Sequence, residues 1–370
     1  MGFLGSVLPF VVLIGVVVVV HELGHLVIAR ANGVFCEVFS FGFGPSLASW
    51  TDGKGTKWRI ALIPLGGYVK MFGDADATSV RAAIPVGYTG ADMERMSAHR
   101  KKPWQRLVIA AGGPVANFIF AIIVMFFLVF ISGIPHYANT IQVGEQDTPA
   151  YKAGLRTGDI VVKANDIPIT EFAELRTEIS KSAGKELKLR VKRGEQVQEV
   201  TVKMYDGDGA TRKAWSVLGV APMHIFSERV GILRALAHAA IATYSIARDN
   251  IAAVAKMLVG KANVQNLGGI ISVFSLTSSS AEQGVAAYVY MIAMISVMLG
   301  AINVLPIPVL DGGAIILSCI EWIVGRPLPK KAVETVYLTG MVVVGCLLVL
   351  GLWNDLEKCK FFVWVESLFR

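Results

Sequence analysis

The sequence predicts a polytopic α-helical membrane protein, with four transmembrane helices, a membrane-associated β-rich loop and one small soluble α+β domain. Three observations support this fold class. Hydrophobic residues make up 54% of the 370 residues, charged residues make up 17%, and the mean hydropathy is +0.56. The apolar residues gather in runs long enough to cross a bilayer. The stretch after the first run alternates between apolar and polar residues and is punctuated by Gly and Pro, as β structure is.

The composition also limits the classes of partner. A net charge of +7 is typical of a membrane protein with basic loops on one side, and no Lys/Arg cluster is interleaved with aromatic residues as in a nucleic-acid groove. We therefore expect the lipid bilayer, and no nucleic acid, as a partner. The four cysteines are scattered without a C-x-x-C pair, so they predict neither a disulfide framework nor a metal knuckle.

The first transmembrane helix is predicted over residues 1–31. An apolar run over 4–20 leads directly into the sequence H-E-L-G-H. A single helix over 3–30 is about 42 Å long at 1.5 Å per residue, which is enough to cross a bilayer with some tilt. No Lys or Arg precedes Arg30, so we expect the segment to be retained and not cleaved as a signal peptide.

The H-E-L-G-H sequence predicts a metal site. His21 and His25 are four residues apart, so a helix presents both imidazoles on one face to one ion. Glu22 lies one step around the helix, where it can reach a water molecule held by that ion. Two nitrogen ligands and a general base are the arrangement of zinc hydrolases. Ionisable groups at membrane depth are costly, which favours a functional role for them.

Residues 32–106 are predicted to form a loop on the cytoplasmic side. The loop is rich in Lys and Arg, whereas no basic residue precedes the first helix, so the positive-inside rule places the N-terminus outside. Within it, 35–73 is predicted to be β structure with a hairpin-type turn at Asp52-Gly53. The alternatives are an ordinary cytoplasmic hairpin and a sheet that dips towards the bilayer. Its apolar content favours the second, in which the strand edges pack on helices or line a wet cavity. Residues 75–99 are expected to be a flexible connection.

The second transmembrane helix is predicted over 107–132. Gly112, Gly113 and Pro114 near its cytoplasmic end are expected to break or thin the helix and to let a neighbour approach closely. Asn117 is a polar group within the span and needs a partner. Its interpretation stays open between a helix–helix hydrogen bond and a role at the site.

The soluble domain is predicted over 136–222. Its expected elements are one helix and four strands, at 172–183 and at 140–146, 159–169, 186–204 and 214–223. The stretch around Gly154-Leu155 and Gly158-Asp159-Ile160 resembles a PDZ domain of the bacterial protease-associated form. Alternation across the second helix places this domain outside the cytoplasm. PDZ-type grooves bind extended peptides by adding a strand, so a peptide ligand is a possible partner.

Residues 228–284 are predicted to form an interfacial amphipathic helix followed by a Gly/Ser-rich connector. The third transmembrane segment, 285–325, is expected to be broken, because Pro306 and Pro308 cannot continue a regular helix and Gly312-Gly313 loosens it again. A broken helix at membrane depth has to be buried or line a cavity. Asp311 is thereby placed in apolar surroundings, where it is either a third metal ligand or the N-cap of the next half-helix.

A fourth transmembrane helix is predicted over 334–354, and it leaves a C-terminal tail at 355–370. Four crossings return the chain to the side on which it began. We therefore expect both termini and the soluble domain on the same, outer side of the membrane.

The H-E-L-G-H sequence in a first span and N-x-x-P-x-P-x-L-D-G in a late span together resemble the site-2 protease family of intramembrane zinc metalloproteases. The order of segments is similar to its bacterial, RseP-like branch, although some members carry two tandem PDZ domains where this chain has room for one. The resemblance implies zinc as the cofactor, His21, His25 and Asp311 as its ligands, and Glu22 as the general base. It also implies that the β-rich loop holds the substrate extended. The residues expected to contact the substrate are Asn303, Pro306, Pro308, Gly66, Gly67 and Asn117.

The function implied is a zinc-dependent endopeptidase that cleaves single-span proteins in the bacterial inner membrane, with its termini and PDZ domain in the periplasm. Glu22 would activate a zinc-bound water for attack on the scissile carbonyl. Substrates implied by the resemblance are anti-sigma factors after a first external cut, or remnant signal peptides. Two alternatives are a zinc-binding scaffold, which would not need Glu22, and a transporter, which would need a second broken helix that the first half does not show.

Overall fold

The computed structural model describes residues 3–73, 89–144, 148–182, 184–204, 218–226, 230–258 and 268–358. The chain divides into two compact units, one formed by 1–128 with 236–370 and the other by 129–235. Several expectations lie partly outside the described residues, among them the connection over 75–99, the first residues of the strand at 214–223, and the C-terminal tail over 355–370. The described part of the connection, 89–99, contains helical turns at 90–95 and 98–100.

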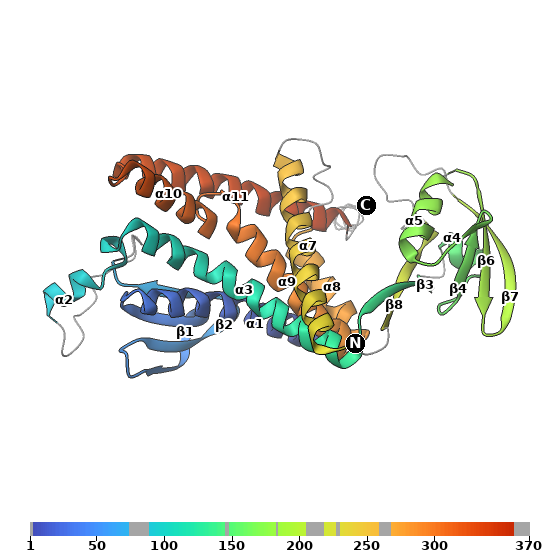
Figure 1. Cartoon of the computed structure of the whole chain (residues 1–370), viewed down its shortest axis with the longest axis horizontal. Coiled ribbons are helices and arrows are strands. Elements are labelled where there is room, and N and C mark those ends of the chain that lie inside the picture. The colour runs from blue at the N-terminus through green and yellow to red at the C-terminus, as the bar shows by residue number, and fades with distance from the viewer. Residues whose placement is uncertain are drawn as a thin grey trace, which may run out of the picture. The chain divides into compact units, whose positions relative to one another are not determined.

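Four helices among the described residues are long and apolar enough to cross a membrane. They are α1 (Phe3–Ala31), α3 (Pro103–Ser132), α9 (Val285–Val304) and α11 (Lys330–Lys358). The remaining helices of the first unit are α2 (Gly90–Arg95), the 3-10 turn η1 (Ala98–Arg100), α7 (Ile232–Leu258), α8 (Ile270–Glu282) and α10 (Asp311–Val324). In Figure 1 the strands β1 and β2 lie against the blue α1. The teal α3 meets α1 at Gly112 and Gly24.

Helix α3 corrects one expectation, because it runs through Pro114 without a break. The close approach predicted for its glycines is present. A Cβ atom added to Gly24 of α1 would lie 2.2 Å from the carbonyl oxygen of Gly112, so the two backbones touch where neither residue has a side chain. The packing of α3 on α1 next to Pro114 stabilises the helical conformation of α3 at the proline, although the proline removes one backbone hydrogen bond.

The β-rich loop forms a sheet from β1 (Cys36–Thr51) and β2 (Lys57–Met71), two long bent strands. Residues 36–41 pair with 67–71 on one side and with 57–60 on the other, while 46–51 pair with 57–61. The segment 67–71 therefore forms one edge of the sheet. The base of the sheet shares a buried apolar cluster with α1 and α3, consisting of Leu26, Ala29, Val34, Cys36, Phe39 and Ile109.

The turn between the two strands is tied to the end of α1. Asp52 accepts hydrogen bonds from Trp58 Nε1 at 2.9 Å and from the amide of Thr56 at 3.1 Å, and it pairs with Arg30 of α1. Burial would raise the pKa of the Asp52 carboxyl, but the hydrogen bonds from Trp58 and Arg30 hold it well below its ordinary value. The carboxylate thus stays ionised and keeps the sheet attached to the helix that carries H-E-L-G-H.

Helices α9 and α10 are the two halves of the broken segment. Residues 305–310 separate them, and Val309 has a φ of +83°, which is rare for a β-branched residue. The break lets α10 begin at Asp311. The helix α7 packs one face on α3 and α9 through a buried cluster of small and flexible side chains: Ala121, Met125, Ala239, Ala293 and Val297.

The expected Gly/Ser-rich connector was wrong for residues 270–282, which form α8. These residues form a helix because a residue far along the chain caps the N-terminus of α8. Asp355 of α11 accepts hydrogen bonds from the amides of Gly269, Ile271 and Ser272 at 3.0, 2.9 and 3.1 Å. These are the amides that a helix start leaves without partners, so a carboxylate there stabilises a helix with weak local signals.

The second unit, 129–235, contains a six-stranded sheet in the order β7-β6-β4-β3-β8, with β5 paired to β4. Its strands are β3 (Pro135–Val143), β4 (Ile160–Ala164), β5 (Ile167–Pro168), β6 (Glu186–Arg193), β7 (Gln196–Lys203) and β8 (Val220–Phe226). Its helices are α4 (Pro149–Lys152) and α5 (Phe172–Lys181). The unit has its own buried core, to which Leu155, Val161, Leu175 and Leu187 belong.

Within this unit, Arg193 holds the buried carboxylate of Asp159 through two hydrogen bonds, of 2.7 and 2.8 Å. The Asp159 side chain is 1% exposed. We expect Arg193→Ala to lower the free energy of unfolding of this unit by about 3 kcal/mol, because it leaves a buried charge unpaired. Arg193→Lys keeps the charge and should cost less. Pulse proteolysis of the full-length chain measures the loss, and equal stability of the wild type and the Ala variant would contradict this.

Candidate metal centre

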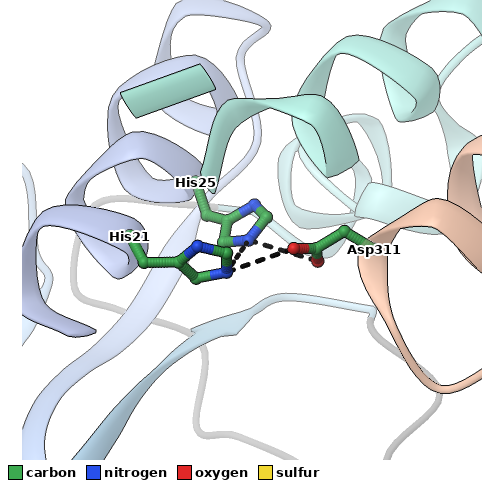
Figure 2. Close-up of side chains that lie close together, drawn as sticks. All are labelled: His21, His25 and Asp311. Atoms are coloured by element: carbon green, nitrogen blue, oxygen red, sulfur yellow. Dashed lines mark hydrogen bonds and ion pairs between the residues drawn. The ribbon is translucent and has the colours of Figure 1, made fainter. Parts of the chain in front are cut away.

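Three side chains from the two ends of the chain meet at one point. His21 and His25 come from α1, and Asp311 is the first residue of α10 (Figure 2). The two Nε2 atoms lie 3.2 Å apart, and the carboxylate oxygens lie 3.1 Å from His21 Nε2 and 3.3 Å from His25 Nε2. The structure therefore brings the H-E-L-G-H sequence of α1 next to the start of α10, where the late sequence motif ends.

These three residues fit a zinc ion. One donor atom from each lies within 4.8 Å of the others, and the two histidines are only 7% and 8% exposed. Asp311 Oδ2 is buried and takes part in no hydrogen bond among the described residues, as expected of an oxygen reserved for a metal. Two imidazoles and a carboxylate are a donor set that zinc prefers, and three protein ligands leave a position for a reacting group.

A backbone carbonyl of α3 fixes the orientation of the His25 ring. Its Nδ1 lies 2.9 Å from the carbonyl oxygen of Ile109 in α3. A carbonyl only accepts hydrogen bonds, so Nδ1 carries the proton and Nε2 offers its lone pair to the site. No sequence signal identifies this partner, because it is a backbone atom.

Helix α3 also passes directly behind the ligand atoms. A Cβ atom at Gly113 would lie 2.4 Å from His25 Nε2 and 2.7 Å from His21 Nε2. Any larger residue would thus collide with the two Nε2 atoms, which are the predicted metal ligands. The sequence predicted close packing at this glycine, but not that the neighbours would be the two histidines.

Glu22, the remaining polar residue of H-E-L-G-H, is hydrogen-bonded to the β-sheet. Its Oε2 accepts a hydrogen bond of 3.0 Å from the amide of Val69, which lies in the edge segment 67–71. The predicted general base is therefore hydrogen-bonded to the β-rich loop, which the family resemblance implies holds the substrate. Val69 was missed by the sequence reasoning, since its contribution is again a backbone group.

A cavity of about 330 Å³ opens beside these residues. Of the residues expected to contact substrate, Asn303, Gly66 and Gly67 line it together with His21, Glu22 and Asp311. Pro306 and Pro308 are not among its lining residues, and Asn117 lies behind His21. The sequence reasoning did not single out the other lining residues, which are Val18, Phe43, Leu299, Val309 and Leu310.

Comparison with known proteins agrees with this geometry. Residues 9–347 match the model of the family described as Peptidase family M50. The chain is 31% identical to metalloprotease MmpA of Caulobacter vibrioides over 100% of this chain and 99% of that protein. It is 32% identical to a Mesorhizobium japonicum protein whose name describes a zinc metalloprotease, over 96% and 100% of the two chains. It is 29% identical to the regulator of sigma-E protease RseP of Salmonella typhimurium, over 97% and 100%.

These matches confirm the resemblance and the zinc cofactor that the two motifs predicted. They support an enzyme over the zinc-binding scaffold and the transporter that the sequence analysis considered as alternatives. The three predicted ligands and Glu22 lie within the matched residues. The chain therefore belongs to peptidase family M50, the site-2 protease family, and is a membrane zinc metalloendopeptidase.

Proposed function

We propose that this protein cleaves single-span membrane proteins within or near the bilayer, with His21, His25 and Asp311 as the zinc ligands and Glu22 as the general base. The observation that carries the proposal is the position of the triad. Two of its members lie on α1, a helix long enough to span a membrane. The third begins α10, which follows the interruption of the helix after α9. A peptide bond has to reach that depth to be cut.

The reaction follows from the residues around the cavity. When bound, zinc polarises a carbonyl and activates water. Glu22 lines the cavity with its carboxylate oriented by the Val69 amide, so it can take a proton from water and return it to the leaving amine. Asn303 lines the same cavity and has a side-chain amide that can donate a hydrogen bond to a developing oxyanion.

The substrate has to be extended before it is cut, because a transmembrane helix hides its carbonyls in its own hydrogen bonds. The edge segment 67–71, with Gly66 and Gly67 at the cavity, offers backbone partners to an extended chain. Pairing with this edge offsets part of the cost of unwinding.

The unit over 129–235 is proposed to be a PDZ domain on the periplasmic side that screens or docks substrates already trimmed outside. The positive-inside rule supports this orientation, because a basic cluster (Arg100, Lys101, Lys102 and Arg106) lies around the start of α3. An anti-sigma factor or a remnant signal peptide has the single span and short external part that this arrangement requires. The relative from Salmonella typhimurium is named a regulator of sigma-E.

The test is the site of cleavage. The purified chain is mixed in detergent with a model single-span protein, and the fragment masses are measured. We expect a cut within the apolar segment, blocked by a zinc chelator and restored by added zinc. Cuts confined to the polar flanks would contradict the proposal.

Helix stability in the substrate should control the rate. Replacing three Leu residues by Gly around the cleaved bond removes about 2–3 kcal/mol of helix preference. We therefore expect cleavage at least tenfold faster than in the Leu-rich parent, measured as initial rate at equal concentration. Three Gly placed one helical turn outside the cleaved region provide the control. Equal rates for all three substrates would show that unwinding is not part of the barrier.

A further inference from the structure

We propose that Asn117 is a positioning residue for the metal site: its side-chain amide accepts the hydrogen bond of the Nδ1–H group of His21 when His21 binds zinc. The sequence suggested a substrate contact for this residue. The structure instead places it on the far side of His21 from the ligand atoms, so its action on the site passes through the imidazole.

The first support is burial without a complete set of partners. Asn117 is 0% exposed, and its Nδ2 lies 3.2 Å from His21 Nδ1. Its Oδ1 is buried and has no hydrogen-bond partner among the described residues. Buried amide oxygens are nearly always bonded, and a half-turn of the amide exchanges its nitrogen and oxygen, so the opposite orientation gives Oδ1 a partner at His21 Nδ1.

The second support is the tautomer of His21 that zinc binding through Nε2 requires. To offer Nε2 to a metal, His21 has to carry its proton on Nδ1, as His25 does opposite the Ile109 carbonyl. A protonated Nδ1 donates, so the amide group facing it has to present its oxygen. A half-turn of the amide about Cβ–Cγ exchanges nitrogen and oxygen at that place.

With Oδ1 facing Nδ1, Asn117 holds the His21 proton on Nδ1. The lone pair of Nε2, which lies 3.1 Å from Asp311 Oδ2, is then available to the zinc ion that the three residues fit.

Zinc affinity of the full-length chain in detergent tests this, measured by competition with a chelator that buffers free zinc. Asn117→Leu has a similar volume and no acceptor, so we expect a 10- to 100-fold loss of affinity, the usual effect of losing such a partner. Asn117→Asp can only accept, and it should hold zinc within about threefold of the wild type or more tightly. The readout is binding, so it does not depend on whether the protein cuts membrane proteins.

Ser296→Ala is the matched control. Ser296 Oγ donates to the backbone carbonyl of Asn117 at 3.1 Å in the same buried region, so its loss should leave zinc affinity unchanged. Wild-type affinity in Asn117→Leu would overturn the proposal, and so would an equal loss in the Leu and Asp variants, because packing alone would then explain both. Nitrogen NMR of zinc-loaded wild-type protein labelled on histidine needs no variant to fold. A His21 ring with its proton on Nε2 would also overturn the proposal.

Discussion

Glu22→Gln is expected to abolish peptide cleavage while the protein keeps its zinc. The glutamine side chain has nearly the same shape and can still receive the Val69 amide through its carbonyl oxygen. It cannot take a proton from water at neutral pH. General base catalysis contributes about 10²–10⁴-fold to such reactions, so we expect a rate at least 100-fold below that of the wild type.

Two measurements on the same preparation are needed. Elemental analysis should find equal zinc in the Gln variant and the wild type, and fragment formation from a single-span substrate should be lost only in the variant. Cleavage at the wild-type rate would remove Glu22 from the base role. Loss of zinc together with activity would show that Glu22 supports the metal site instead.

Gly113→Ala is expected to empty the metal site. The added Cβ would lie 2.4 Å from His25 Nε2, well inside contact distance, and would meet both rings of the ligand pair. Movement of α3 away from α1 would relieve this clash only by breaking the close backbone packing between Gly112 and Gly24. Overpacking of this kind costs about 1–3 kcal/mol or more, and here the easiest relief is movement of the imidazoles away from the metal.

Zinc content after dialysis against buffered free zinc is the direct measurement, and Asp311→Ala provides the comparison in which one ligand is removed. Both variants should bind far less zinc than the wild type. Gly345→Ala is the matched control, because a Cβ there meets no atom within 4 Å. A Gly113→Ala protein with a full zinc content would show that the rings have room that the structure does not indicate.

The residues of the candidate site could be predicted because their spacing has a direct physical meaning. Two imidazoles four residues apart share a helix face, and two prolines shortly before Asp311 break a helix, so the elements that carry both motifs were predicted. The family and its zinc are confirmed by comparison. The assignment of individual roles to His21, Glu22 and Asp311 stays a prediction until the variants are measured.

The features that the sequence analysis missed depend on contacts between residues far apart in the chain. The helix α8 depends on a cap by Asp355, and the orientation of Glu22 depends on the amide of Val69. Both are contacts between distant parts of the chain, and one partner in each is a backbone group that every residue type carries. Likewise, Pro114 continues its helix because α3 packs on α1. Local sequence signals contain none of this information.

The predicted third ligand, Asp311, follows the histidine pair far along the sequence. During synthesis, α1 therefore enters the membrane with two of the three predicted ligands and the predicted base, but without the carboxylate that completes the site. A polypeptide whose translation stops before residue 311 is expected to be inert towards its neighbours in the membrane. We therefore expect hydrolysis only once the chain has been made as far as Asp311 and this residue has reached the two histidines.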